Sequence, residues 1–296
     1  MNAVPEKPKR SETTTRYYEK VINQMRCDLS TDGDGLDFLL DYKAVCDWID
    51  EGRSLNTRKT FYAVVKAMIK ESGELDRFLG VLEKFNKKFS DVAEQVKKVV
   101  EAQKPSEREE LAMMPWPSIK KVVADFTAEA NASGDATLIQ EATLLCCYVL
   151  MPPRRLDFSP LRVVKRKNAK AKDNHLIVNK KSMTFTFHEF KTAKAMGSQT
   201  LKVPADLEAQ LRNWLEFNST GWLFTTQGGA PMSESHLSTV LIRIFERLTG
   251  KKIGVDILRH SFITWMREGE MPLTEKQTLA EQMGHSVQTN ELYRRV

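Results

Sequence analysis

Cysteine is scarce in this sequence, and its few positions exclude most cysteine chemistry. The four cysteines among 296 residues are Cys27, Cys46, Cys146 and Cys147. None of them belongs to a CxxC pair, the spacing typical of zinc and redox sites. Cys146 and Cys147 are adjacent within an apolar run, so we expect buried free thiols rather than disulfides. The chain therefore suits a reducing compartment.

Long hydrophobic runs are also absent. The longest, Leu144 to Met151, is far shorter than the roughly 20 residues that a membrane-spanning helix needs. The segment Met1 to Arg10 is polar and rich in Pro and Lys, so it lacks the apolar core of a secretion signal. We therefore expect an intracellular protein that is not secreted.

Acidic residues are rare between Arg162 and Lys194, where Asp173 and Glu189 accompany ten Lys and Arg residues. The whole chain has a net charge of +6 and a pI near 9.0. Such a basic cluster is typical of proteins that bind a phosphate backbone, but a solvated hairpin with an import-like tract has the same composition. The residues predicted to contact a polyanion such as DNA are Lys165, Arg166, Lys167, Lys170, Lys172, Lys180, Lys181 and Lys194.

Two units and a linker are predicted from the pattern of apolar and polar residues. After a disordered tail over 1–14, apolar residues recur at helical spacing, which predicts a helical unit over 15–104. The polar, Pro-containing stretch 105–117 is predicted to be a linker. The second unit, 118–296, combines helices with strand-like alternation at Leu176–Val178, Met183–Phe187 and Thr200–Val203. The predicted class is mainly α with a small antiparallel β-sheet (α+β).

The segment Val255 to Val296 concentrates the residue types that phosphodiester chemistry requires. It holds the run Leu258-Arg259-His260-Ser261-Phe262, then Gly284-His285 after a helix, and then Tyr293. Without a metal, this chemistry needs a nucleophile, cations for the non-bridging oxygens, a hydrogen-bond donor beside them and an acid for the leaving oxygen. A Tyr, an Arg and a His supply three of these four.

These motifs resemble those of the tyrosine recombinase (phage integrase) family, in which an Arg in an LRH-S/T-F run precedes a GH pair and the nucleophilic Tyr. The family's first catalytic Arg follows an apolar helix in an R-x-x-E-x-x-x-L pattern. Arg154 matches that arginine, because Pro152-Pro153 stops the helix before it and Asp157 stands at the position of the Glu. The adjacent Arg155 is an alternative, but only Arg154 gives both spacings.

The catalytic lysine of the family lies in a hairpin, in a K-T/G-x-K run before a strand that ends in Val-Pro. Lys191 matches it, and Lys194 is the alternative. A lysine on a hairpin can enter the minor groove and donate a proton to the leaving 5′ oxygen. The order of candidate catalytic residues is therefore Arg154, Lys191, Arg259, His285 and Tyr293.

The resemblance implies a site-specific recombinase or integrase of a mobile genetic element. Tyr293 would attack a DNA phosphate to give a 3′-phosphotyrosine, without metal, ATP or other cofactor. Double-stranded DNA would be the partner, a homo-tetramer would act on paired sites, and the helical unit would be a core-binding domain. A type IB topoisomerase shares these residues and is the nearest rival. A DNA-binding protein that kept the fold but lost catalysis is the other.

Three departures from the family pattern concern the last segment. Asp256 stands where the family has a His or Lys, three residues before the second Arg. We hypothesise that Asp256 orients Arg259 or His260 and that His260 partly replaces the missing group, since the three share one helix face. The spacing from Gly-His to Tyr293 is one residue shorter than usual, and only three residues follow Tyr293. Relatives commonly use a longer tail to dock on a neighbouring protomer, so the sequence does not predict how the protomers couple.

Overall fold

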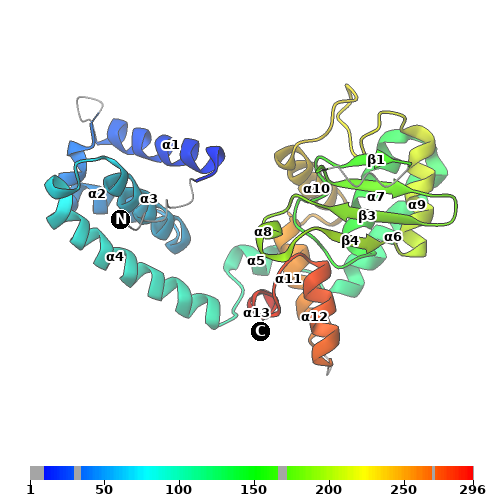
Figure 1. The fold of residues 1–296 in the computed structure, drawn as a ribbon. Coiled ribbons are helices and arrows are strands. Elements are labelled where there is room, and N and C mark those ends of the chain that lie inside the picture. The colour runs from blue at the N-terminus through cyan, green and yellow to red at the C-terminus, as the bar shows by residue number, and fades with distance from the viewer. Residues whose placement is uncertain (1–9, 30–34, 166–171, 269–270, 296) are drawn as a thin grey trace, which may run out of the picture. The chain divides into compact units, whose positions relative to one another are not determined.

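The computed structural model describes residues 10–29, 35–165, 172–268 and 271–295 (Figure 1). It divides into two compact units, Met1–Ala102 and Gln103–Val296. The chain is mostly helical, with a small four-stranded sheet, so the predicted class is confirmed. In the described part of the chain, no helix is long and apolar enough to cross a membrane.

The first unit is entirely helical in its described residues. Its elements are α1 (Glu12–Asp28), the 3₁₀ turn η1 (Asp37–Leu40), α2 (Tyr42–Asp50), α3 (Leu55–Glu71) and α4 (Leu75–Glu101). The predicted tail over 1–14 was too long, because α1 begins at Glu12, where the Ser11 side chain accepts from the Thr14 N–H as an N-cap. The buried face of α4 places Phe78, Leu82 and Phe85 in the core of this unit.

The segment predicted as a linker over 105–117 contains helix α5 (Glu107–Ala112) and belongs to the second unit. A capping box starts α5, in which the Ser106 and Glu109 side chains each bond the other's backbone N–H. Lys251 donates to the carbonyl oxygens of Leu111 and Met113, at 2.9 and 3.1 Å. The polar composition of this segment therefore reflects a surface helix attached to the second unit.

The second unit packs helices against one mixed sheet. Its helices are α6 (Trp116–Ser133), α7 (Ala136–Val149), α8 (Ala193–Met196), α9 (Ala205–Phe217), α10 (Glu234–Thr249), α11 (Val255–Met266), α12 (Leu273–Gln282) and α13 (Val287–Tyr293). The strands are β1 (Arg162–Val164), β2 (His175–Val178), β3 (Met183–Phe187) and β4 (Gln199–Lys202). They lie in the order β1-β2-β3-β4. The β2–β3 and β3–β4 pairs are antiparallel as predicted, whereas β1, a strand not predicted, pairs in parallel with β2.

Helix α7 lies in the middle of the second core, which explains why most of its residues are apolar. Its residues are buried from Glu141 to Val149. Tyr148 meets Phe158 edge to face at 5.3 Å, and Phe158 meets Phe185 of β3 in the same way, also at 5.3 Å. This packing fixes the loop after α7, residues 150–161, between the helix and the sheet.

Candidate active site

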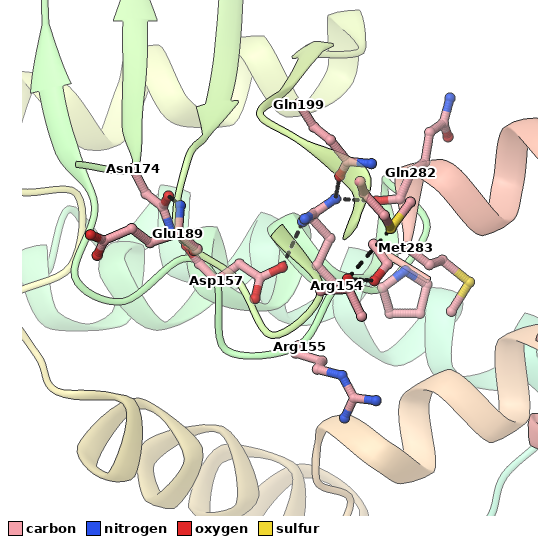
Figure 2. Close-up of polar contacts among 12 residues, drawn as sticks. Arg154, Arg155, Asp157, Asn174, Glu189, Gln199, Gln282 and Met283 are labelled. Atoms are coloured by element: carbon pink, nitrogen blue, oxygen red, sulfur yellow. Dashed lines mark hydrogen bonds and ion pairs between the residues drawn. The ribbon is translucent and has the colours of Figure 1, made fainter. Parts of the chain in front are cut away.

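The loop after α7 presents Arg154 to the interior of the second unit. Pro152 and Pro153 prevent α7 from continuing. The Tyr148 hydroxyl then fixes the loop by donating to the Arg155 carbonyl oxygen at 2.8 Å. The Arg154 side chain is fully buried. Figure 2 shows it pointing between Asp157 on one side and Gln199 and Gln282 on the other, while Arg155 points away from it.

Three contacts hold the Arg154 guanidinium in place. Its Nε donates to Asp157 Oδ2 at 2.8 Å, and its Nη1 donates to Gln199 Oε1 at 2.8 Å and to the Gln282 carbonyl oxygen at 2.6 Å (Figure 2). The guanidinium carbon lies 4.2 Å from the Phe187 ring centroid. The remaining nitrogen, Nη2, is buried and has no hydrogen-bond partner among the described residues. Arg154 is therefore a fixed cation with one free donor group.

Arg259 of α11 is a second fully buried arginine. Its Nη1 donates to the carbonyl oxygens of Pro153 and Met283, at 2.8 and 3.3 Å. Within the described ranges, its Nε and Nη2 have no partner and no carboxylate forms an ion pair with it. Burial lowers the pKa of Arg259, but a guanidinium stays protonated in proteins. Its positive charge therefore has no ion-pair partner among the described residues, and Asp256 acts on it only through a weaker charge interaction.

The Gly284-His285 pair follows the end of α12 and forms a Schellman motif with its last turn. Gly284 has a φ of 70°, its N–H bonds the Glu281 carbonyl oxygen, and the His285 N–H bonds the Ala280 carbonyl oxygen. A side chain at Gly284 would also meet Arg154, because an added Cβ would lie 3.0 Å from Arg154 Nη2. Glycine therefore serves both the left-handed turn and the close approach of Arg154, and it places His285 beside the two arginines.

His285 is buried next to positive charge. Burial and the charges of Arg259, Arg155 and Arg154 lower the pKa of His285 to about 3. Neither ring nitrogen has a hydrogen-bond partner in the described part of the chain. At neutral pH, His285 is therefore an uncharged imidazole with one N–H free to donate.

Tyr293 lies against these groups at the end of α13. Its ring centroid is 4.7 Å from the Arg259 guanidinium carbon and 5.5 Å from the His285 ring centroid. The phenol oxygen accepts a hydrogen bond from Arg155 Nη2 at 3.0 Å. The Tyr293 side chain thus lies beside the groups that have unpaired donors.

The free donors define what this site can bind. Buried polar groups in proteins are nearly always hydrogen-bonded. Around Tyr293 and Gly284, the arginine and histidine nitrogens without a partner among the described residues are Arg154 Nη2, Arg155 Nε, Arg259 Nε and Nη2, and both nitrogens of His285. Three of these four side chains are cations. Such a set matches a tetrahedral oxyanion, because phosphate oxygens accept several N–H bonds at once.

Lys191 lies in the connection between β3 and β4, which is anchored to the same site at both ends. The Thr192 hydroxyl donates to the Gly284 carbonyl oxygen at 2.6 Å. At the other end, Gln199 accepts from Arg154 and donates to the Glu281 carbonyl oxygen at 2.9 Å. Lys191 itself is exposed. Lys191 therefore lies at the edge of the site, next to Thr192, which contacts Gly284.

Solved structures of one integrase resemble this chain along nearly its whole length. The Tn1549 transposon integrase in complex with circular intermediate DNA aligns with a TM-score of 0.60 and 15% identity, over 97% of this chain and 90% of that one. With transposon right-end DNA, it aligns with a TM-score of 0.55 and 14% identity, over 98% and 90%. XerA recombinase gives a TM-score of 0.42 and 13% identity, over 96% and 87%. No family model and no curated protein matches the sequence.

The Tn1549 alignments span both the helical unit and the unit with the sheet. This chain has the tyrosine recombinase fold. The resemblance drawn from the Arg-His-Ser-Phe and Gly-His motifs is thereby confirmed for the fold. The roles of individual residues rest on the geometry of the site itself.

Asp256 and His260 do not lie as hypothesised within this recombinase fold. Asp256 is exposed and forms no hydrogen bond or ion pair with a described residue, and it acts on Arg259 and His260 only through its charge, which opposes the fall in their pKa values. Carbonyl oxygens of Pro153 and Met283 accept the hydrogen bonds that hold Arg259. His260 is buried, and its Nδ1 contacts the Tyr293 carbonyl oxygen at 2.6 Å. Its Nε2 lies 3.1 Å from Glu109 Oε1 and 3.0 Å from Arg295 Nη2. Both ring nitrogens are occupied, so His260 holds the backbone rather than replacing a phosphate donor.

The basic residues predicted to bind DNA divide between the two ends of the sheet. Lys172, which precedes β2, and Lys194, which follows β3, lie at the same end as Lys191. The turn after β2, with Lys180 and Lys181, lies at the opposite end, as does Lys165 after the parallel strand β1. All of these lysines are exposed. Arg166, Lys167 and Lys170 lie outside the described residues.

Gln199 and Asn174 had not been predicted as site residues, and Arg155 had been named only as the alternative to Arg154. Gln199 binds Arg154 across 45 positions of sequence, and Arg155 rather than Arg154 contacts the Tyr293 hydroxyl. Asn174 joins the Arg154 loop to the β3–β4 connection, because its amide donates to the carbonyl oxygens of Asp157 and Glu189, at 3.0 and 2.7 Å (Figure 2). Of these three residues, only Arg155 could have been found from the sequence, because it is adjacent to Arg154.

The lowered pKa of His285 predicts a pH-dependent loss of stability. Below about pH 6.5, the unfolded chain binds a proton at this residue that the folded chain does not bind until about pH 3. The free energy of unfolding should therefore fall on acidification, and between pH 7 and pH 5 this one group accounts for about 2 kcal/mol. His285→Gln should reduce the fall by that amount in urea titrations followed by tryptophan fluorescence, since Trp116, Trp214, Trp222 and Trp265 report on the second unit.

A matched control for this measurement is His236→Gln. His236 is an exposed histidine near the start of α10, outside the site. The His236→Gln variant should lose about as much free energy of unfolding between pH 7 and pH 5 as the unsubstituted chain does. Equal pH dependence in the His285→Gln and His236→Gln variants would contradict the neutral, buried state of His285.

Proposed function

We propose that this chain is a site-specific DNA recombinase that cuts and rejoins DNA through a 3′-phosphotyrosine. One observation carries the proposal. The buried donors of Arg259 and His285 that have no partner among the described residues lie against the ring of Tyr293. The unpaired Nη2 of Arg154 lies beside Gly284, the residue before His285. A nucleophile thus lies beside a site suited to a phosphate. The likeness to the Tn1549 integrase supports the same function through the fold.

Each residue has a role in the proposed reaction. The phenol oxygen of Tyr293 forms a bond to the scissile phosphorus while the bond from phosphorus to the 5′ oxygen breaks. Arg154 and Arg259 neutralise the non-bridging oxygens, and the neutral imidazole of His285 donates one hydrogen bond to them. Lys191, with Lys194 as the alternative, gives its proton to the leaving 5′ oxygen.

Rejoining follows the same path in reverse. A 5′ hydroxyl from another strand attacks the phosphotyrosine and releases Tyr293. Because the phosphotyrosine conserves the energy of the phosphodiester bond, the reaction needs no ATP, and we propose that it needs no metal. Attack by a strand from a second duplex gives integration, excision or resolution of a mobile element. This exchange requires paired DNA sites, and we propose that a homo-tetramer acts on them inside the cell.

DNA contacts extend beyond the catalytic groups in this proposal. The exposed lysines on the two ends of the sheet contact the backbone of the duplex, together with Arg166, Lys167 and Lys170. The helical unit, residues 15–104 in the sequence-based division, acts as a core-binding domain. The Tn1549 integrase was solved with DNA, which supports double-stranded DNA as the partner.

The proposal is tested by trapping the covalent intermediate on DNA of random sequence. Because the trapped DNA is sequenced, the target site does not have to be known beforehand. The full chain is incubated, in EDTA, with duplexes that have a random central sequence and a nick. The short strand beyond the nick is lost after cleavage, so rejoining is blocked. DNA that stays attached to protein after denaturation is recovered and sequenced. We expect an adduct with a recurring sequence at its 3′ end.

Other outcomes identify the rival functions. DNA binding without any adduct would show a binding protein that has the fold but not the reaction, and it would contradict the proposal. An adduct accompanied by relaxation of supercoiled plasmid, with no recombinant product from paired sites, would assign a type IB topoisomerase. Recombinant product from two duplexes that carry the recovered sequence is the result that we expect.

A further inference from the structure

Glu109 of α5 is connected to the tyrosine although 184 positions of sequence separate them. Its two carboxylate oxygens have different partners. Oε2 accepts from the Ser106 backbone N–H at 2.7 Å and from the Ser106 hydroxyl at 2.9 Å, which completes the capping box of α5. Oε1 accepts from Arg295 Nη2 at 2.8 Å and lies 3.1 Å from His260 Nε2. Glu109 thus joins the start of α5 to the segment that carries Tyr293.

His260 and Arg295 fix the backbone on both sides of the Tyr293 side chain. A carbonyl oxygen only accepts, so His260 Nδ1 carries the proton that it donates to the Tyr293 carbonyl oxygen at 2.6 Å. The Arg295 N–H donates to the Thr264 hydroxyl at 3.0 Å, and Arg295 Nη1 donates to the Leu292 carbonyl oxygen at 3.0 Å. Residues 292 to 295 are therefore held by side chains of α11 and, through Glu109, by α5.

The charges in this network are compatible with one another. Burial opposes ionisation of Glu109, but hydrogen bonds from Arg295 and Ser106 outweigh it and lower its pKa to about 2. Glu109 is therefore an anion at neutral pH. Burial also lowers the pKa of His260, so its Nε2 is unprotonated and accepts from Arg295 at 3.0 Å. Arg295 Nη2 donates one N–H to Glu109 Oε1 and the other to His260 Nε2, so the guanidinium holds together two acceptors that lie 3.1 Å apart and have no hydrogen between them.

We propose that Glu109 is a positioning residue for Tyr293, acting through Arg295 and His260. The proposal rests on the proposed function of Tyr293 as the nucleophile. Glu109 forms no hydrogen bond or ion pair with Arg154, Arg259 or His285 in the described part of the chain. It acts on the position of the Tyr293 backbone. Because α5 begins a few residues after the boundary at Ala102 and Gln103, the segment that joins the two units is thereby linked to the position of the nucleophile.

Glu109→Gln tests the proposal with little change of shape. A glutamate has two acceptor oxygens and a glutamine has one, so the variant can keep the capping box or the contact with Arg295 but not both. The first readout is the rate of adduct formation in a single turnover at saturating nicked duplex. We expect a fall of about tenfold or more, with the dissociation constant for DNA within about twofold of the unsubstituted value. Circular dichroism confirms that the variant folds.

The second readout reports the position of the tyrosine without requiring catalysis. The chain has six tyrosines, and labelling with 3-fluorotyrosine gives each a ¹⁹F signal. The Tyr293 signal is assigned by its loss in Tyr293→Phe. We expect Glu109→Gln to shift or broaden this signal. If the unsubstituted chain formed no adduct, the proposed function would fail, while the ¹⁹F measurement would still test the positioning.

Two further variants separate positioning from a general effect on α5. Ser106→Ala removes the hydroxyl that caps α5 and leaves Glu109 Oε1 with Arg295, so both readouts should stay near those of the unsubstituted chain. Arg295→Ala should slow adduct formation at least as much as Glu109→Gln does, and adding Glu109→Gln to it should cause little further loss, because both act on one path. Arg295→Lys keeps the charge and should recover part of the rate.

The results that would overturn the proposal are specific. An unchanged ¹⁹F signal for Tyr293 in Glu109→Gln would contradict the link between Glu109 and the tyrosine. A changed signal with an unchanged rate of adduct formation would show that the link does not serve the reaction. Equal effects of Ser106→Ala and Glu109→Gln would assign the loss to the stability of α5 instead.

Discussion

Tyr293→Phe is expected to bind DNA as the unsubstituted chain does and to form no covalent adduct. The substitution removes only the phenol oxygen, which is the atom proposed to attack phosphorus. The ring keeps its packing against Arg259 and His285. Loss of a nucleophile costs roughly 10⁴-fold or more in rate. Adduct formation on the nicked duplex is therefore expected to fall below detection, with the dissociation constant for DNA within about twofold.

Tyr148→Phe is the matched control for this variant. Tyr148 also has its hydroxyl at the Arg154–Arg155 loop, but it is fully buried and donates to the Arg155 carbonyl oxygen. The variant loses a hydrogen bond and some stability, but it should still form the adduct. If Tyr293→Phe retained the adduct, another residue would be the nucleophile and the proposed mechanism would be wrong.

Arg259→Ala is expected to lower the rate of adduct formation by about 10²- to 10³-fold, which is the usual cost of removing a donor that stabilises charge in a transition state. Two of the nitrogens of Arg259 have no partner among the described residues, so their N–H groups are the ones available to the phosphate. Arg259→Lys should be nearly as slow, because an ammonium cannot offer the planar pair of donors. Single-turnover rates at saturating DNA measure both.

The control for Arg259 is an arginine outside the site. Arg243 is largely exposed and shares the buried Glu141 with Arg247, so Arg243→Ala leaves that carboxylate paired. Its rate of adduct formation should stay within about twofold of the unsubstituted chain, since a surface ion pair contributes little. A small effect of Arg259→Ala, comparable with that of Arg243→Ala, would show that the unpaired donors do not serve the reaction.

The convergence of Arg154, Arg259, His285 and Tyr293 followed from short motifs with local physical causes. The prolines after α7 fix where the helix stops, and so place Arg154 in a loop. Gly284 dictates the left-handed turn that places His285. Each of these is a property of a few neighbouring residues, but the nomination of the four residues as one catalytic set rested on the resemblance of the motifs, and of their order, to the tyrosine recombinase family.

Contacts between residues far apart in the sequence could not be predicted in this way. Nothing near Asp256 in sequence indicated that carbonyl oxygens of Pro153 and Met283 would orient Arg259. The contacts of His260 could not be predicted for the same reason, since its partner Glu109 lies in another element. The pairing of Glu109 with Arg295 spans nearly the whole second unit, and no local pattern records it.

The helix within the predicted linker had a sequence signal, but the polar composition of the stretch was given more weight. The polar stretch 105–117 suggested an exposed connection. However, Ser106 is followed three residues later by Glu109, which is the capping-box pattern of a helix start. Strand β1 is different, because three residues, Arg162 to Val164, give too little alternation to predict, and its parallel pairing with β2 depends on the fold of the whole unit.

The most direct test of the account identifies the atom that carries DNA. The adduct formed on the nicked duplex is digested with nuclease and trypsin, and the nucleotide-bearing peptide is sequenced by mass spectrometry. The account predicts a nucleotide joined through its 3′ phosphate to the phenol oxygen of Tyr293, in the peptide from Gln277 to Arg294. A nucleotide on any other residue, or joined through a 5′ phosphate, would contradict it.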